Sequence, residues 1–132
     1  MANTFYPKGK TKILTAKINF EIDAIKAAVV KNTYNFANGH EFVSDLGAHV
    51  IASEVLQSQS VVDGAFDADD VVFKALAAGN TARAIVLYKD TGVAGTSPLI
   101  SYLDDVPGLP AATSGSDLRM TWSDGPDKII GI

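Results

Sequence analysis

The sequence has no cysteine and only two histidines, His40 and His49. The absence of cysteine excludes disulfide bonds, thiolate metal sites and cysteine nucleophiles. Two histidines also fall short of the three protein ligands that a histidine-built zinc site normally requires. No glycine-rich phosphate cradle is present, since Gly9-Lys10-Thr11 lacks the earlier glycine of a P-loop. We therefore expect no metal ion and no other cofactor.

Long apolar runs and an excess of basic residues are also missing. No stretch approaches the roughly 18 apolar residues of a membrane-spanning helix, so we expect no membrane partner. The first residues lack the apolar region of a secretory signal, and no leader peptide is expected. The net charge of −4 argues against nucleic acid as a partner, because phosphate binding needs a basic surface.

The residues that are present suit a compact fold. The chain has 132 residues, of which 47% are hydrophobic and 20% charged, enough to build a core but too few residues for two typical domains. We find no internal repeat, and the Pro/Gly/Ser-rich stretch near 106–110 is too short to separate domains. The sequence predicts a single domain over residues 1–132.

Most of the chain reads as short strands separated by turn signals. A short helix is predicted from Pro7 to about Ala16, with proline in the first turn, and one or two helical turns over 40–46, ended by Gly47. Asp63-Gly64 is a strong hairpin signal, and a final hairpin is predicted around residues 124–126. The expected strands cover residues 23–31, 50–56, 58–62, 70–76, 82–89, 99–103, 118–123 and 128–132.

These elements define the predicted fold class. Seven or eight short strands, with a turn about every ten residues, are typical of an antiparallel β-sandwich or barrel. One or two short helices complete the expected mainly β architecture.

Charge is unevenly distributed along the chain. Residues 1–31 carry six lysines and two acidic residues, a net charge of +4, whereas residues 32–132 carry a net charge of −8. We interpret residues 1–20 as a basic N-terminal arm or short helix. Its lysines either form the solvated face of that helix or dock on an acidic surface. The residues that we expect to bind a partner are Phe5, Tyr6, Lys8, Lys10 and Lys12.

An acidic cluster lies around the Asp63-Gly64 turn and comprises Asp63, Asp67, Asp69 and Asp70. Carboxylates near a turn are potential calcium ligands, but the spacing lacks the glycine and glutamate positions of an EF-hand loop. The favoured interpretation is that these side chains accept hydrogen bonds from backbone groups at turns.

Catalytic arrangements are weakly supported, and we do not expect an enzyme. Asp104-Asp105 and the Asp124/Asp127 pair lie in predicted loops, and no strained nucleophile elbow accompanies the histidines. Trp122 is the one aromatic residue that we consider as a ligand contact, by stacking on a saccharide. Core packing is the default for it and for the other strand aromatics.

Seven short stretches distributed over the whole chain resemble sequences of one known family. They are residues 1–8, 25–30, 40–46, 63–71, 84–92, 98–100 and 120–122. The family consists of small proteins encoded with the structural genes of tailed bacteriophages. Its motifs are structural, without a catalytic signature, and supply no functional residues.

The resemblance implies a virion structural protein, made in the host cytoplasm and incorporated into the particle. A capsid decoration, or cement, protein on the capsid surface is the favoured expectation. Its partners would be the major capsid protein and copies of itself, as a homotrimer on local threefold axes. The alternatives are a tail or baseplate component and a carbohydrate-binding β-module for host recognition.

Overall fold

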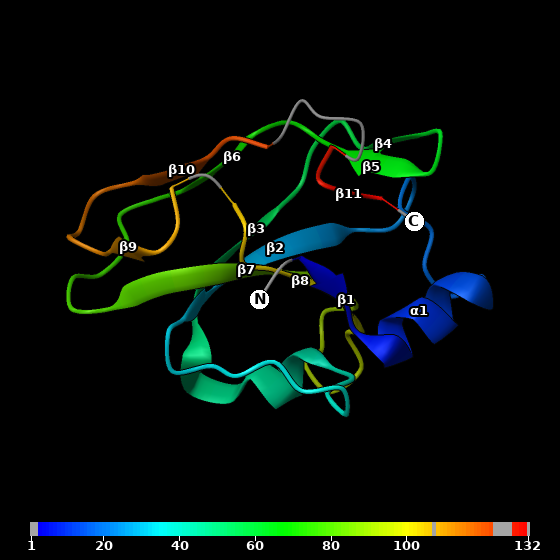
Figure 1. Cartoon of the computed structure of the whole chain (residues 1–132), viewed down its shortest axis with the longest axis horizontal. Coiled ribbons are helices and arrows are strands. Elements are labelled where there is room, and N and C mark those ends of the chain that lie inside the picture. Colours follow the sequence, from blue (N-terminus) through cyan, green and yellow to red (C-terminus); the bar gives the residue numbers. More distant parts are fainter. Residues whose placement is uncertain (1–2, 107, 123–127, 132) are drawn as a thin grey trace.

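The computed structural model describes residues 3–106, 108–122 and 128–131. Its centre is a twisted antiparallel sheet (Figure 1) with the strand order β1-β8-β7-β2-β3, and β9 pairs with one end of β7. The bounds of these strands are β1 Thr4–Phe5, β8 Leu99–Leu103, β7 Thr81–Lys89, β2 Ile25–Lys31, β3 Val50–Val55 and β9 Ala111–Ala112.

The three central strands are buried on both faces. In β2, β7 and β8 most residues are buried, on either face of the sheet, and the partly exposed ones lie mainly toward the strand ends. Their sequences are correspondingly rich in Val, Ile, Leu and Ala on both sides of the alternation. A sheet of this kind requires an apolar cover on each face, and the remaining elements supply the two covers.

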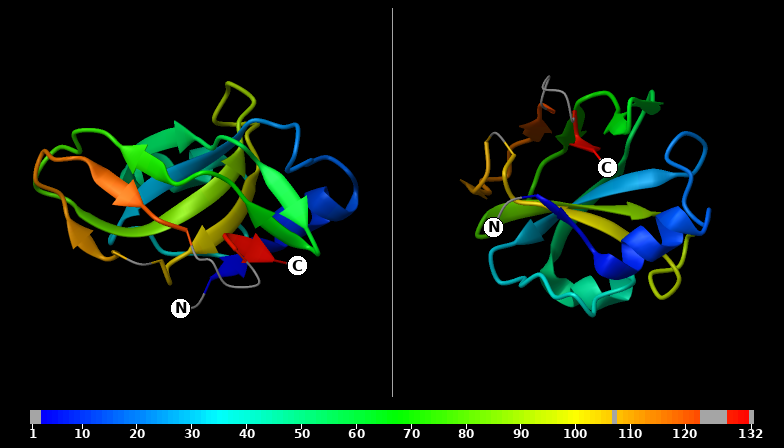
Figure 2. Two further views of the ribbon diagram at one scale, coloured as in Figure 1. Left: turned by 90° about the horizontal axis from the view of Figure 1, so that it is seen from above. Right: turned by 45° about the vertical axis from the view of Figure 1, so that its right-hand side comes forward.

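Two small sheets cover one face. One sheet has the order β11-β5-β4, with β4 Ser60–Val62, β5 Ala65–Asp67 and β11 Ile130–Gly131. The other pairs β6, Val71–Phe73, with β10, Leu118–Met120. Between these sheets and the central sheet lies the larger core cluster, which includes the fully buried Phe73, Leu87 and Met120. Figure 2 shows this cover and the opposite one as separate layers.

The opposite face is covered by an irregular segment, residues 32–42, and by the 3₁₀ helix η1, Val43–His49. The segment is attached to the central sheet at the start of β8, where the Leu99 amide donates to the Glu41 carbonyl and the Val43 amide to the Ser97 carbonyl. Beneath it lies a second core cluster rich in tyrosine, with Tyr6, Tyr34, Tyr88 and Tyr102.

The first helix, α1 Pro7–Leu14, packs against β8. Pro7 occupies the first turn, where its missing N–H has no consequence, and Ala16 ends the helical path with a φ of +62°. Gly9 is buried, and a Cβ on it would lie 2.5 Å from the Leu99 carbonyl oxygen. Only glycine permits this close approach of helix and strand. No helix among the described residues is both long and apolar enough to cross a membrane.

The predicted mainly β class is confirmed. Strands make up 38% of the residues and helices 12%, in antiparallel sheets that form a small β-sandwich-like fold. Each of the eight predicted strands overlaps a strand of the structure, whereas β1, β5 and β9 were not predicted. The short helix after Pro7 and the helical turns near Gly47 are present, and Gly47 has the positive φ expected of it.

The predicted turn at Asp63-Gly64 is confirmed. Asp63 and Gly64 have φ angles of +52° and +78°, and Val62 pairs with Ala65 across them. Positive φ at both central residues is the requirement of a type I′ hairpin turn.

The predicted C-terminal hairpin is wrong. β10 pairs with β6 and β11 pairs with β5, so these two strands are not partners of each other. The reason is that each of these strands pairs with an earlier strand, β6 or β5, and that β6 and β5 belong to different small sheets. The turn residues 124–126 lie outside the described residues.

We expect Gly9→Ala to destabilise the protein, although alanine is normally the better helix former. The added methyl group meets backbone carbonyls that cannot move without displacing β8, and such overpacking typically costs about 1–3 kcal/mol. Chemical denaturation measures the change in the free energy of unfolding.

Gly39→Ala is the matched control, since a Cβ there meets no atom within 4 Å. We expect it to leave the stability unchanged or to raise it by up to about 1 kcal/mol. Equal effects of the two substitutions would contradict the close packing of α1 on β8.

Candidate interaction surface at the N-terminal helix

The five residues expected to bind a partner divide into two groups. Tyr6 is fully buried in the second core cluster, and Lys12 is held within the fold. Lys8 and Lys10 are exposed on α1, and Phe5 is half-buried at the edge of the central sheet. The structure therefore brings them together in one segment but leaves only part of that segment available on the surface.

Tyr6 belongs to a chain of hydrogen bonds that joins the N-terminal segment to the 32–42 segment. Its hydroxyl lies 2.7 Å from the Tyr34 hydroxyl, which in turn lies 2.8 Å from Nδ1 of His40. When Nδ1 of His40 is unprotonated, it accepts from Tyr34, and Tyr34 accepts from Tyr6. These hydrogen bonds then give both buried hydroxyl groups a partner, without which each would carry a desolvation cost.

Burial changes the acidity of these tyrosines. Desolvation raises the pKa of Tyr6 far above its usual value, and the hydrogen bond from Tyr6 to Tyr34 adds to this effect. Desolvation also raises the pKa of Tyr34 and of Tyr102. Tyr6, Tyr34 and Tyr102 are therefore uncharged at neutral pH, and all three belong to the second core cluster.

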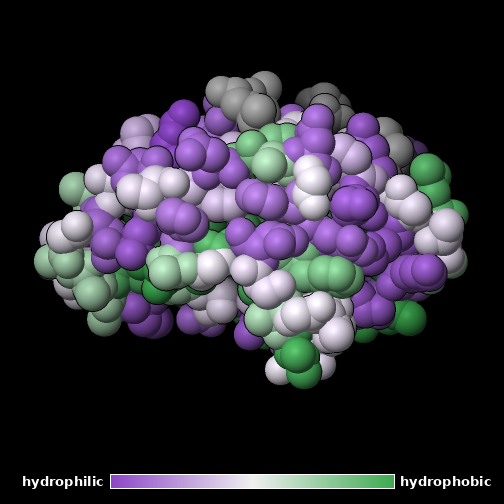
Figure 3. Space-filling model, turned by 90° about the horizontal axis from the view of Figure 1, so that it is seen from below, coloured by the Kyte–Doolittle hydropathy of each residue, from purple (hydrophilic) through white to green (hydrophobic). Residues whose placement is uncertain are grey.

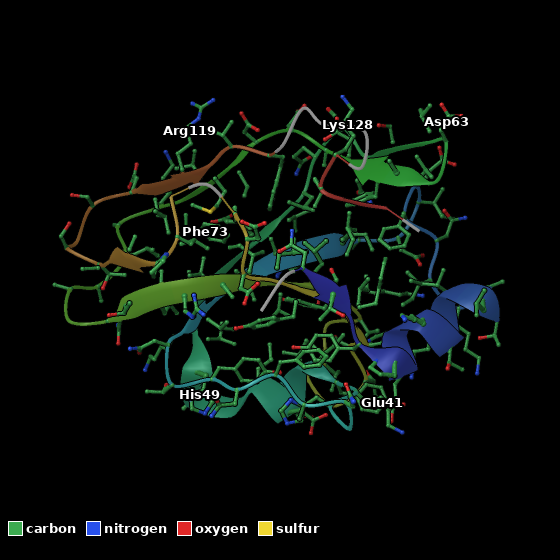
Figure 4. The ribbon with its side chains drawn as sticks, viewed as in Figure 1. Glu41, His49, Asp63, Phe73, Arg119 and Lys128 are labelled. Carbon is green, nitrogen blue, oxygen red and sulfur yellow. The ribbon has the colours of Figure 1, made fainter. Side chains whose placement is uncertain are left out.

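Lys12 is anchored to the covering segment. Its Nζ lies 2.6 Å from Oε2 of Glu41 and 5.2 Å from the centre of the Phe42 ring. The hydrogen bond from Lys12 holds the pKa of Glu41 below its usual range. Figure 4 shows Glu41 beside the start of α1. Lys12 thus stabilises the attachment of α1, and we assign it no contact with a partner.

The outer side of α1 borders an apolar groove. Two adjoining hollows of about 340 and 330 Å³ share Phe5 and Ile13. Their lining includes residues of α1 and of the β4–β5–β11 sheet. We call this feature the apolar groove. Its lining residues are Phe5, Lys10, Ile13, Leu14, Phe20, Val61, Gly64, Phe66, Ile130 and Gly131.

Two large apolar side chains that line the groove are exposed. Leu14 is 84% exposed and Val61 40%. Lys10 lines one hollow, and Lys8 and Lys17 are exposed on and just after α1. An exposed apolar patch that is rimmed by polar residues is characteristic of interaction surfaces. The face seen in Figure 3 is mostly polar, with hydrophobic residues at both ends and along its lower edge.

The acidic cluster is used within the fold. Asp70 accepts a hydrogen bond from the Trp122 amide at 3.1 Å and lies 3.6 Å from the Arg119 guanidinium, while the Asp69 carbonyl accepts from the Trp122 indole at 3.0 Å. These contacts fasten β10 to β6. Asp63 lies at the tip of the β4–β5 hairpin (Figure 4). Among the described residues, no three acidic or histidine side chains gather as a metal site requires.

The hypothesis that Trp122 contacts a ligand is contradicted. Its side chain is buried in the larger core cluster, at 7% exposure, so its ring faces are unavailable for stacking. Tyr88, Tyr102, Phe66 and Phe73 are buried as well, which confirms core packing for the strand aromatics.

The histidines and carboxylate pairs do not form a catalytic arrangement in the described part of the chain. Nδ1 of His40 contacts Tyr34, and Nδ1 of His49 lies 2.8 Å from the Thr33 hydroxyl. Asp104 is buried beside Arg83, whereas Asp105 is exposed. Asp124 and Asp127 lie outside the described residues.

The comparisons with known proteins add no family. No family model matches the chain, and no curated protein matches it.

The raised tyrosine pKa values predict a loss of stability at high pH. An acid whose pKa is higher in the folded state stabilises the fold below its unfolded pKa, about 10 for tyrosine, and this contribution is lost as the pH rises further. We expect Tyr6→Phe to lower the free energy of unfolding by about 1 kcal/mol at pH 7 and to weaken the decline above pH 10. Urea titrations from pH 7 to 11 measure both, and an equally steep decline in the variant would refute the role of Tyr6.

Proposed function

We propose that the chain is a structural protein of a tailed-bacteriophage particle, and specifically a capsid decoration protein. It binds the outer surface of the shell and contacts the major capsid protein. The proposal draws on the seven stretches that resemble phage structural proteins and on the surface around α1. The role is structural and assigns no residue to catalysis.

The observation that carries the proposal is the apolar groove with its exposed lysines. A side chain such as Leu14, 84% exposed, gains about 1.5–3 kcal/mol when a partner covers it fully. The lysines beside it favour an acidic partner surface and accelerate association. Such a surface suits a protein whose task is to bind other proteins in many copies.

Stabilisation of the shell follows from mass action. A protein that binds the mature shell and not its disassembled subunits shifts the equilibrium toward the shell. Copies that also contact one another link neighbouring capsid subunits and resist the internal pressure of packaged DNA. A homotrimer on local threefold axes is the assembly that we propose.

The location in the particle is the first test. Particles of the phage that encodes this chain are separated into DNA-filled heads and free tails, and each fraction is analysed by quantitative peptide mass spectrometry. We expect many copies per head and none enriched in tails. Enrichment in tails would replace the decoration role with a tail or baseplate role, and absence from both fractions would refute the virion proposal.

The groove is tested by substituting an exposed apolar residue. Leu14→Ser should weaken binding to purified shells by about tenfold or more, because the apolar area is no longer transferred from water. Its melting temperature should be unchanged, since Leu14 makes little contact within the fold.

Val93→Ser is the matched control, since Val93 is 59% exposed and is not among the residues that line the groove. Binding is measured by cosedimentation with shells that lack the protein. If Leu14→Ser binds as tightly as Val93→Ser, the groove is not the docking surface.

A further inference from the structure

A separate hollow, more polar than the apolar groove, lies on the other side of the central sheet. Its volume is about 250 Å³, and it opens between the 32–36 segment and the ends of β7 and β8. The β7 and β8 side contributes Arg83, Tyr102 and Asp104, and the 32–36 segment contributes Asn32, Tyr34, Asn35 and Phe36. We call it the polar pocket. It shares no residue with the apolar groove.

A β-bulge brings Arg83 into the polar pocket. Val30 pairs with Ala84 and Lys31 pairs with Ala82, so Arg83 is the extra residue of β7 and has no partner of its own on β2. A bulge changes the direction in which a side chain leaves the strand, and bulges are frequent beside binding sites. Ala82 consequently packs in one core cluster and Ala84 in the other, with Arg83 at the change of face.

The polar groups of the pocket offer both donors and acceptors. The Arg83 guanidinium lies 4.0 Å from Oδ2 of Asp104, whose side chain is only 2% exposed, whereas that of Arg83 is 39% exposed. Asn32 and Asn35 are exposed at the mouth, and each amide both donates and accepts hydrogen bonds. The charge of Arg83 is balanced by Asp104, which favours an uncharged ligand over an anion.

Aromatic rings form the apolar part of the wall. The Phe36 ring centre lies 5.7 Å from that of Tyr102, which lies 6.0 Å from that of Tyr34. Phe36 is half-buried and lines the pocket. A volume of about 250 Å³ is below the roughly 300–1,000 Å³ of pockets for drug-sized ligands. It suits a single small ring.

We propose that the polar pocket binds a neutral, polyhydroxylated ring, that is, one sugar unit. Its hydroxyl groups match the donors of Arg83 and the mixed donors and acceptors of the two asparagines, and its apolar face packs against Phe36. This binding site is separate from the surface proposed to contact the capsid, and it does not depend on that role.

The test is a titration of ¹⁵N-labelled full-length protein followed by two-dimensional NMR. The probes are glucose, galactose, mannose, N-acetylglucosamine and rhamnose, each raised to about ten times a millimolar Kd, and a bacterial surface polysaccharide. We expect at least one probe to shift the amides of residues 32–36, 82–84 and 102–105 together. Shifts with a free sugar would identify a monosaccharide as the ligand, and shifts with the polysaccharide only would identify a sugar unit of a polymer. Either result supports the site.

Two variants and one control make the test specific. Arg83→Ala should weaken binding by about tenfold or more, because a hydrogen bond from a charged donor is lost, and Asn35→Ala, at an exposed position, should weaken it without affecting the fold. Arg119→Ala is the control, since Arg119 is the second of the two arginines in the sequence and lies on β10.

Three results would overturn the proposal. They are the absence of shifts with every probe, shifts confined to other parts of the chain, and binding that both Arg83→Ala and Asn35→Ala leave unchanged. Acetate and inorganic phosphate are titrated in parallel, and shifts of the same amides by these anions but by no sugar would show an anion site instead.

Discussion

The burial of β2, β7 and β8 on both faces is the constraint on which the rest of the structure depends. These strands are too apolar to leave either face in water, so each face must be covered. The two small sheets cover one face with the larger core cluster. The other face is covered by the 32–42 segment, η1 and Tyr6, which together enclose the tyrosine-rich cluster.

This second cover explains why the N-terminal segment is part of the fold. The Tyr6 amide donates to the Ile100 carbonyl at 2.9 Å, and the Tyr6 side chain fills the tyrosine-rich cluster. Gly9 then lets α1 lie directly on β8. The inner side of the segment is thus occupied by the protein's own core, and the outer side, with Lys8, Lys10 and Leu14, is what remains for a partner.

The elements that the sequence predicted are those whose signal is local. Residues 82–89 form a mostly apolar run between two turn signals, which is enough to predict β7, and Asp63-Gly64 defines its own turn. The two-residue strands β1 and β9 form only because β8 and β7 offer them an edge, and no local pattern reports that. The C-terminal hairpin was predicted wrongly for the same reason, because sequence neighbours were assumed to pair.

The candidate site was predicted only in part. The lysines and aromatics of residues 5–12 were identified from composition, but composition does not show that Tyr6 and Lys12 face inward. Leu14, an apolar residue that follows the lysine-rich residues 8–12, was the available signal for the groove. Nothing in the sequence indicated that Arg83 lines a pocket. Its position results from a register shift between β2 and β7 that exists only in the folded sheet.

The central claim is that the N-terminal segment belongs to the fold before any partner binds. Native-state hydrogen exchange on the free protein, followed by NMR, tests it most directly. We predict that the amides of Tyr6 and Lys10, which donate to the Ile100 and Tyr6 carbonyls, exchange slowly alongside those of β8. Rapid exchange of both amides in the free protein, with protection only after a partner is added, would show a mobile arm and contradict the account.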